Sequence, residues 1–148
     1  AEAEGESFDF VFPLNEELQL PVVRELKGWK DYEILGVPVR LVGMCDAIHG
    51  RKVYDHKLTK KIDFDQYEDG MQWRAYCSIF NANEMVFNLF QQYTDRKNIT
   101  RVNRLEQLNM FRYPELENDV EKSIAAHVEF CLQWCPDIVD EYKGSEPF

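Results

Sequence analysis

Residues 31–58 read DYEILGVPVRLVGMCDAIHGRKVYDHKL, and this stretch decides the fold. It contains three strand-like runs, which are YEIL, VRLVGMCDAI and KVYDHKL, and the second of them is apolar and β-branched. Short turn signals separate them, first at Gly36-Val37-Pro38 and then at His49-Gly50. Apolar runs bounded by glycine and proline are typical of strands joined by tight turns. The stretch therefore predicts an antiparallel meander of three strands.

The segments next to the meander predict two helices and a fourth strand. Upstream, Pro21 and Gly28 suggest a short helix over residues 21–28, because proline favours a helix start and glycine a helix end. Downstream, the apolar period changes from about Tyr67, which indicates a helix. The run EMVFNLFQQY, residues 84–93, predicts the fourth strand. The apolar stripe of the downstream helix is expected to comprise Met71, Ala75, Ile79 and Phe80.

The last third of the chain predicts a basic loop and a long amphipathic helix. Residues 94–105 are expected to form the loop, leading into another strand or a short helix. After Pro114, the run ELENDVEKSIAAHVEFCLQW has helical periodicity, and Pro136 is expected to end it. Its buried stripe is expected to comprise Val120, Ile124, Val128, Cys131, Leu132 and Cys135.

This order of elements predicts one α/β domain over residues 1–148, with a mixed sheet flanked by helices. Residues 1–7 and 144–148 are expected to be disordered tails. No run approaches the length of about 18 apolar residues that a membrane span needs, so no membrane is expected. The first residues are acidic, unlike a secretory signal, and a cytoplasmic protein is therefore expected.

The cysteines, the histidines and the charge limit the class of protein further. The spacing of the four cysteines suggests buried free thiols rather than a disulfide framework or a metal cluster. The three histidines lack the spacing of zinc ligands. The formal net charge of −10 argues against a nonspecific nucleic-acid coat. Two stretches are nevertheless basic: residues 51–61 have a net charge of +4 and residues 92–112 of +3, which suits local steering of a polyanion.

One short motif, Asp55-His56-Lys57, suggests chemistry. On a strand, residues i and i+2 share a face, so Asp55 and Lys57 point the same way and His56 points away. Asp46 lies across the expected hairpin. Two carboxylates beside a lysine form a hard-oxygen site for a divalent cation, to which the His56 backbone carbonyl adds a third oxygen. The triplet alone is weak evidence, because acid-x-Lys recurs at Glu25-Leu26-Lys27, Asp95-Arg96-Lys97 and Glu141-Tyr142-Lys143.

Three motifs in order strengthen this interpretation: GMCD at residues 43–46, VYDHK at 53–57 and QWRAY at 72–76. Together they resemble the PD-(D/E)XK nuclease superfamily, in its RecB-type and phage exonuclease-like branch. The resemblance implies a restriction-endonuclease-like αβββαβ core and a Mg²⁺- or Mn²⁺-dependent nuclease that acts on DNA. It implies Asp46 and Asp55 as metal ligands, with Lys57 completing the catalytic set. The residues expected to bind DNA are Gln72 and Tyr76 of the third motif, the neighbouring Arg74, and Lys60.

The chain also departs from the family pattern. The family usually carries a further acid on an upstream helix, for which Glu25 is the best placed candidate here, ahead of Glu16 and Glu17. No cysteine precedes Cys45, so no iron–sulfur cluster is expected. Two other interpretations stay open: a catalytically silent nuclease-like DNA-binding or scaffold module, and an unrelated α/β interaction domain with chance motifs. The sequence also leaves open a homo-oligomer or a partner protein.

Overall fold

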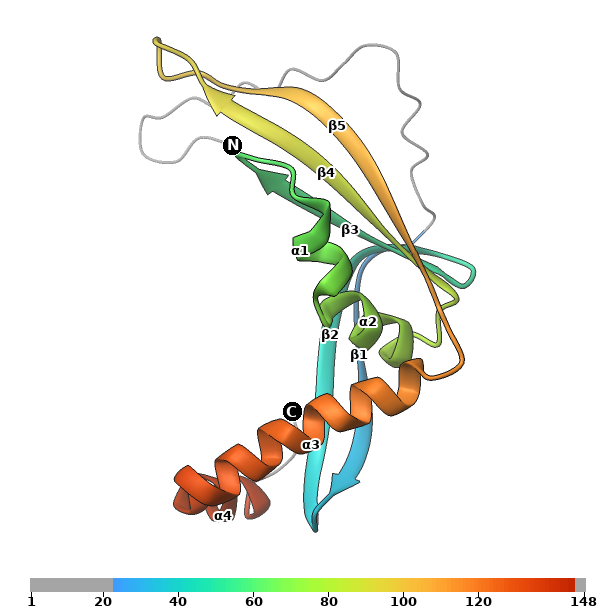
Figure 1. Cartoon of the computed structure of the whole chain (residues 1–148), viewed down its shortest axis with the longest axis vertical. Helices are drawn as coiled ribbons and strands as arrows, with labels where there is room; N and C mark the ends of the chain where they lie inside the picture. Colours follow the sequence, from blue (N-terminus) through green and yellow to red (C-terminus); the bar gives the residue numbers. More distant parts are fainter. Residues whose placement is uncertain (1–22, 146–148) are drawn as a thin grey trace.

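The computed structural model describes residues 23–145, which form a five-stranded sheet and four helices (Figure 1). The strands are β1 (Val23–Ile34), β2 (Val37–His49), β3 (Lys52–Thr59), β4 (Glu84–Thr94) and β5 (Thr100–Phe111). The helices are α1 (Phe64–Asp69), α2 (Gln72–Ile79), α3 (Leu116–Trp134) and α4 (Pro136–Lys143).

The sheet is mixed and its strands lie in chain order, β1-β2-β3-β4-β5. The first three strands are antiparallel, as the meander predicted, and β5 is antiparallel to β4. β4 runs parallel to β3, so the chain must cross over between them, and α1 and α2 form that crossover. The predicted α/β class, with a mixed sheet flanked by helices, is confirmed.

Both turns of the meander lie one residue from the predicted position. The first consists of Leu35 and Gly36, whose φ angles of 52° and 73° match the twist of a two-residue hairpin. Val37 and Pro38, predicted as turn residues, already pair with β1. The second turn is Gly50-Arg51, with Gly50 at a φ of 60°.

The helix predicted over residues 21–28 is wrong in its described part, since residues 23–28 belong to β1 and pair with β2. Pro21 and Val22 lie outside the described residues, as does the predicted tail of residues 1–7. The segment PVVRELKGW is short and lacks a clear period. Backbone pairing with the long apolar β2 therefore determines its conformation, which is the usual way that tertiary context overrides weak local preference.

The helical region between β3 and β4 is also different from the prediction. Gly70 separates two short helices where a single helix from about Tyr67 was expected. In α2 the buried residues are Trp73, Cys77 and Ser78, none of which was in the predicted stripe. Ile79 and Phe80, the last two members of that stripe, do lie against Gly28 of β1. Met71, the first member of the stripe, is exposed and lies before the helix.

The C-terminal predictions hold more closely. The predicted basic loop of residues 94–105 is shorter than expected, since Thr94 ends β4, residues 95–99 form the turn and β5 begins at Thr100. The long helix α3 is confirmed. Val120 and Val128 are buried in its stripe, but Leu132 is exposed, because the last turns of α3 extend beyond the sheet. Pro136 ends α3 and at once begins α4 at the first helical position, where its missing N–H costs nothing. Gly144 and Ser145 follow α4 as a turn, and residues 146–148 lie outside the description.

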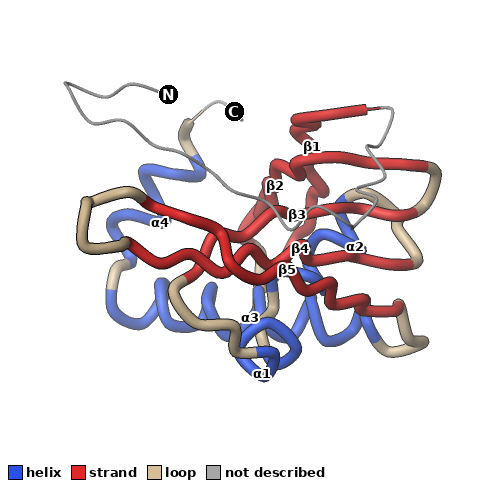
Figure 2. The backbone as a smooth tube through the Cα atoms, turned by 90° about the horizontal axis from the view of Figure 1, so that it is seen from above, coloured by secondary structure: helices blue, strands red, loops and turns tan. Residues whose placement is uncertain are grey.

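The main core lies between the sheet and α2, on the side of the sheet where Figure 2 shows α1, α2 and α3. Two glycines bring α2 close to the strands: a Cβ on Gly28 would lie 2.5 Å from the Phe80 ring, and one on Gly43 would lie 3.0 Å from Tyr76. A second cluster, formed by Val37, Val128 and Val139, fixes α3 and α4 to the far end of the β1–β2 hairpin. No described helix is long and apolar enough to cross a membrane.

Candidate active site

The candidate site lies where β2 and β3 separate. These two strands pair over only three positions, from His49 and Lys52 to Ala47 and Tyr54. Beyond that point β2 continues beside β1 alone, and β3 continues beside β4. Asp46 and Asp55 are the next residues on the two strands. Each carboxylate therefore stands at the opening of the fork.

Asp46 is held across this fork. Its Oδ2 atom accepts a hydrogen bond from the backbone N–H of His56 at 2.6 Å. The carboxylate thus takes the N–H that a continuous ladder would have given to a backbone carbonyl, which satisfies that donor and ties the two strands together. The other oxygen of Asp46 has no such partner among the described residues.

Asp55 is the more unusual carboxylate, because it is only 5% exposed. Its Oδ2 atom forms an ion pair with Lys57 Nζ at 2.8 Å but accepts no well-aligned hydrogen bond from a described residue. Burial raises the pKa of Asp55 and the nearby Asp46 charge adds to this, while Lys57 acts in the opposite direction. Asp55 and Lys57 share a face of β3, as the strand periodicity predicted.

The two carboxylates have the ligand chemistry of a divalent-cation site but fewer ligands than a complete one. A buried carboxylate oxygen that accepts no well-aligned hydrogen bond is costly unless positive charge compensates it, and Lys57 supplies part of that charge. Carboxylate oxygens are also the ligands that Mg²⁺ prefers. Within residues 23–145, however, no three or more His, Cys, Asp or Glu side chains gather closely enough to hold a metal. The described residues therefore bring two carboxylates, those of Asp46 and Asp55, to the opening of the fork.

Glu25, the predicted upstream acid, lies on β1 and not on a helix. It sits between the ladder pairs Arg24–Ala47 and Leu26–Cys45, which places it level with Asp46 on the neighbouring strand. Its φ of 52° interrupts the ladder there, and its side chain is exposed. Position in the sheet brings Glu25 near the fork, but its carboxylate does not join the other two.

The third motif supports β2 just before Asp46. Tyr76 lies on α2 and donates a hydrogen bond from its hydroxyl to the Met44 carbonyl oxygen at 3.0 Å. Gln72, one turn earlier, begins the same helix and is half-buried. The predicted Gln-x-x-x-Tyr helix is thus attached to the strand that carries Asp46.

Arg74 is half-buried, and its guanidinium has partners within the protein. Its guanidinium donates to the Gly70 carbonyl oxygen at 2.9 Å and to the Tyr113 hydroxyl at 2.9 Å, and it lies over the Trp73 ring at 4.6 Å. These contacts join the end of α1 to α2. A contact of Arg74 with DNA therefore stays a prediction.

Lys60, by contrast, is exposed just after β3. It borders a hollow of about 330 Å³ together with Gln92, Tyr93 and Thr94 of β4. This hollow lies farther along the strand from the fork, at the end of β3 that follows Lys57.

One polar row went unnoticed in the sequence. The imidazole Nδ1 of His56 lies 3.1 Å from Asn88 Nδ2, and Gln107 Nε2 donates to Asn88 Oδ1 at 2.9 Å. These three side chains lie opposite one another on β3, β4 and β5. The buried Asn88 in the apolar run MVFNLF was the available signal. The row keeps the His56 ring away from Asp55, so His56 is no ring ligand at the fork.

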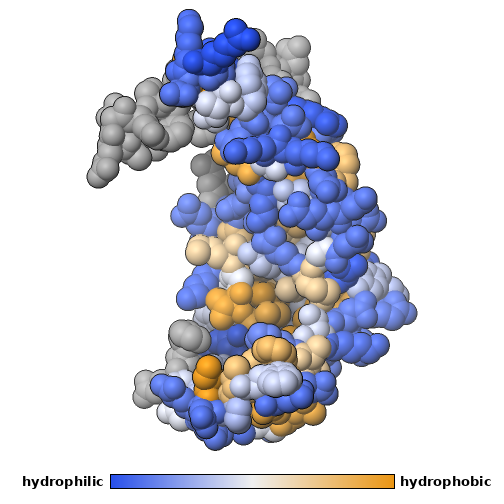
Figure 3. Space-filling view, turned by 60° about the vertical axis from the view of Figure 1, so that its left-hand side comes forward, coloured by the Kyte–Doolittle hydropathy of each residue, from blue (hydrophilic) through white to orange (hydrophobic). Residues whose placement is uncertain are grey.

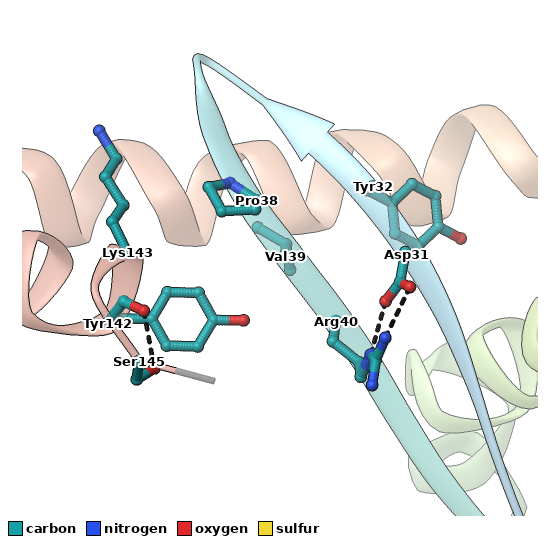
Figure 4. A pocket seen from close by; sticks show the side chains of 8 residues that line it. All are labelled: Asp31, Tyr32, Pro38, Val39, Arg40, Tyr142, Lys143 and Ser145. Atoms are coloured by element: carbon teal, nitrogen blue, oxygen red, sulfur yellow. Dashed lines mark hydrogen bonds and ion pairs between the residues drawn. The ribbon is translucent and has the colours of Figure 1, made fainter. Parts of the chain in front are cut away.

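The clearest hollows lie away from these residues. Figure 4 shows one of about 280 Å³ between β1, β2 and α4, where Arg40 and Asp31 form two hydrogen bonds of 2.7 and 2.8 Å. A larger apolar one of about 500 Å³ separates β2 from α3 and α4. Neither is lined by two carboxylates and a lysine, so the shape of the surface alone does not point to the fork.

Comparisons with known proteins give the fold a solved counterpart. No protein-family model matches the sequence, and no curated protein matches it. Among solved structures the chain is similar to "Crystal structure of SSO0001", with a TM-score of 0.55 and 15% sequence identity. The match covers 76% of this chain and 50% of that chain, so the chain spans half the length of its structural counterpart. At this identity the likeness concerns the α/β fold alone.

Proposed function

We propose that the protein is a metal-dependent deoxyribonuclease of the PD-(D/E)XK type. The observation that supports this is the fork itself, which presents Asp46 and Asp55 from two separating strands and places Lys57 against Asp55 at 2.8 Å. The reaction is hydrolysis of a DNA phosphodiester: water adds to phosphorus, the bond to one sugar oxygen breaks, and that oxygen takes a proton. We infer exonuclease-like action, in phage or bacterial DNA processing, recombination or repair in the cytoplasm.

Asp46 and Asp55 are the residues that would hold the cofactor, Mg²⁺ or Mn²⁺. When bound, such a cation polarises a phosphoryl oxygen and lowers the pKa of a water molecule. The buried Oδ2 of Asp55, whose partner among the described residues is the Lys57 ammonium, favours this assignment, since a cation would add to that compensation. The predicted oxygen from the His56 carbonyl remains part of the proposal.

The remaining residues act through position and charge. Lys57 carries the cation closest to the two acids, and it would offset negative charge that develops on the scissile phosphate. The His56 N–H orients Asp46, and the Tyr76 hydroxyl fixes the strand segment before it. Gln72 shares the face of α2 with Tyr76 and is proposed to position DNA.

The test is a cleavage assay with linear and circular DNA, single- and double-stranded, with Mg²⁺ or Mn²⁺. Asp55→Asn and Lys57→Ala are each expected to lower the cleavage rate at least about 100-fold, the scale of losing one catalytic group. A second readout is calorimetric titration with Mn²⁺ alone, in which Asp55→Asn is expected to remove binding.

The chain contains a matched control in another acid-x-Lys triplet. Glu141 and Lys143 are exposed on α4, far along the chain from the fork, and Glu141→Gln and Lys143→Ala should leave cleavage unchanged. Cleavage that persists in both fork variants would show that the site is elsewhere.

A specific observation favours the second candidate, a catalytically silent nuclease-like DNA-binding module. The described residues bring two acids to the fork where a complete site would have a third. This candidate predicts DNA binding by the wild-type chain with no cleavage under any of these metal conditions.

A further inference from the structure

One end of the molecule concentrates positive charge on an acidic body. Residues 57–61 and 93–104, which we call the basic arm, contain seven lysines and arginines and one acid, a net charge of +6. Because the whole chain carries −10, the rest of it carries −16. The arm comprises the end of β3 and the β4–β5 hairpin, which extends from the sheet away from α3 and α4 (Figure 1). Figure 3 shows this upper end of the molecule as strongly hydrophilic.

The arm is well ordered by its own contacts. β3 stays paired with β4 as far as Thr59 and Gln91, and β4 stays paired with β5 as far as Thr94 and Thr100. At the tip, the Asp95 carboxylate accepts the backbone N–H groups of Lys97 at 2.8 Å and Ile99 at 3.1 Å. The basic side chains are therefore presented on a preformed support, which lowers the ordering cost of binding.

The cations divide into two groups. The first group forms ion pairs: Lys57 with Asp55 at 2.8 Å, Arg101 with Asp95 at 3.2 Å and Arg104 with Glu106 at 2.8 Å. The second group is exposed and forms no ion pair with another residue of the described range 23–145. It comprises Lys60, Lys61, Arg96 and Lys97.

An aromatic side chain lies among them. Tyr93 is 45% exposed, and with Lys60, Gln92 and Thr94 it lines the hollow of about 330 Å³ described above. A cation beside an accessible ring is the combination by which proteins hold single-stranded nucleic acid, with phosphate on the cation and a base stacked on the ring.

We propose that the basic arm binds the phosphate backbone of DNA that extends beyond the candidate active site. Lys57 lies opposite Leu89, and Thr94 is five residues farther along β4. At about 3.3 Å per residue this is roughly 17 Å, or about five nucleotides at 3.4 Å each. The arm thus forms a track that begins at the fork and ends at the hairpin tip.

The occupant is DNA rather than an acidic protein because the cations follow one line that continues from Lys57. The surrounding negative charge repels a polyanion everywhere else and so directs it to this line. The choice of DNA rests on the proposed function, but the binding surface is tested separately from cleavage.

The test measures binding in the Asp55→Asn background without metal, by fluorescence anisotropy of short single- and double-stranded oligonucleotides across a salt series. The arm variant combines Lys60→Gln, Arg96→Gln and Lys97→Gln. It is expected to weaken binding at least about tenfold at low salt and to reduce the salt slope by about 2 to 3, since each lost phosphate contact removes about 0.7 to 0.9. Tyr93→Ala is expected to weaken single-strand binding more than duplex binding.

The matched control combines Lys27→Gln, Lys122→Gln and Lys143→Gln, which remove the same charge from exposed positions outside the arm. It should keep the wild-type salt slope. The proposal is overturned if the arm variant binds DNA like this control, or if the Asp55→Asn protein binds no DNA. Stronger binding to an acidic polypeptide than to DNA would overturn it as well. Arm-dependent binding without wild-type cleavage would refute the nuclease and leave the arm. Wild-type cleavage together with binding that does not depend on the arm would refute the arm and leave the nuclease.

Discussion

Asp55→Asn should stabilise the metal-free protein while it abolishes the proposed activity. The substitution keeps the shape of a side chain that is 5% exposed and removes its charge. A buried polar atom without a hydrogen bond costs about 1–3 kcal/mol, which the neutral amide relieves in part. The lost ion pair is worth less, about 0–1 kcal/mol, because the Lys57 side chain is 32% exposed and can return to water.

The expected net effect at pH 7 is a stabilisation of about 1 kcal/mol, or a rise in Tm of about 2–4 °C in a domain of this size. Its pH dependence has a defined sign. The pKa of Asp55 is raised above the ordinary 3.8 on folding, so its contribution is most favourable below about pH 4 and is lost as the pH rises through the folded-state pKa. The advantage of the variant should therefore grow from pH 4 to pH 7.

Urea denaturation followed by circular dichroism at pH 4, 5.5 and 7, with chelator present, measures this difference. Wild-type protein with Mn²⁺ should gain stability that Asp55→Asn does not gain, because the cation compensates the same charge. A variant that is less stable than wild type at pH 7 by about 1 kcal/mol or more would refute the reasoning. Such a result would mean that the Asp55–Lys57 pair stabilises the fold, as an ordinary structural ion pair does.

Three further predictions concern the fold. Glu117→Gln should destabilise the protein by about 1 kcal/mol at pH 7, a figure already discounted for the partial exposure of Glu117. Partial burial raises the pKa of Glu117, but hydrogen bonds from Lys30, Ser78 and Arg112 outweigh it and hold this pKa below 4.5. The stabilisation by Glu117 is therefore lost on acidification, and urea titrations should show the difference between variant and wild type fade as the pH drops through the usual glutamate range. Gly28→Ala should cost about 1–3 kcal/mol by thermal unfolding, because the new methyl would meet the Phe80 ring at 2.5 Å, whereas Gly144→Ala, with its nearest contact at 3.6 Å, should change little. Thiol titration of native protein at pH 8 should detect two accessible cysteines and two more only after unfolding, since burial raises the pKa of Cys77 to about 11 and also raises that of Cys45. The two expected to react are Cys131 and Cys135.

The elements with strong periodicity could be predicted from the sequence. β2, β3 and α3 have long apolar runs with a clear period, and each was located within a few residues. The segment that became the first half of β1 could not be predicted, because its conformation depends on pairing with a strand up to 25 positions away. Only the end of the α2 stripe, Ile79 and Phe80, was located on the face that meets the sheet, because Gly70 divides the helical region and α2 buries Trp73 and Cys77 instead of its predicted first members.

In the candidate site, too, some features could be predicted from the sequence and others could not. Strand alternation alone predicted that Asp55 and Lys57 share a face, and the hairpin predicted that Asp46 would be nearby. The contacts of Arg74 were not predictable, since they depend on carbonyl groups at the end of α1 and on Tyr113, which is 39 residues away. Neither was the burial of Asp55, which sets its pKa.

The sequence by itself determined the local features of this protein: the meander, the long C-terminal helix, the Asp-x-Lys face and the basic stretches. These follow from the periodicity and charge of neighbouring residues. Only the tertiary structure decided that β2 and β3 separate after three pairs, that Glu25 lies on a strand level with Asp46, and that two distant basic stretches align into one arm. The physical reason is that backbone pairing and burial are determined by partners far apart along the chain, which no local pattern encodes.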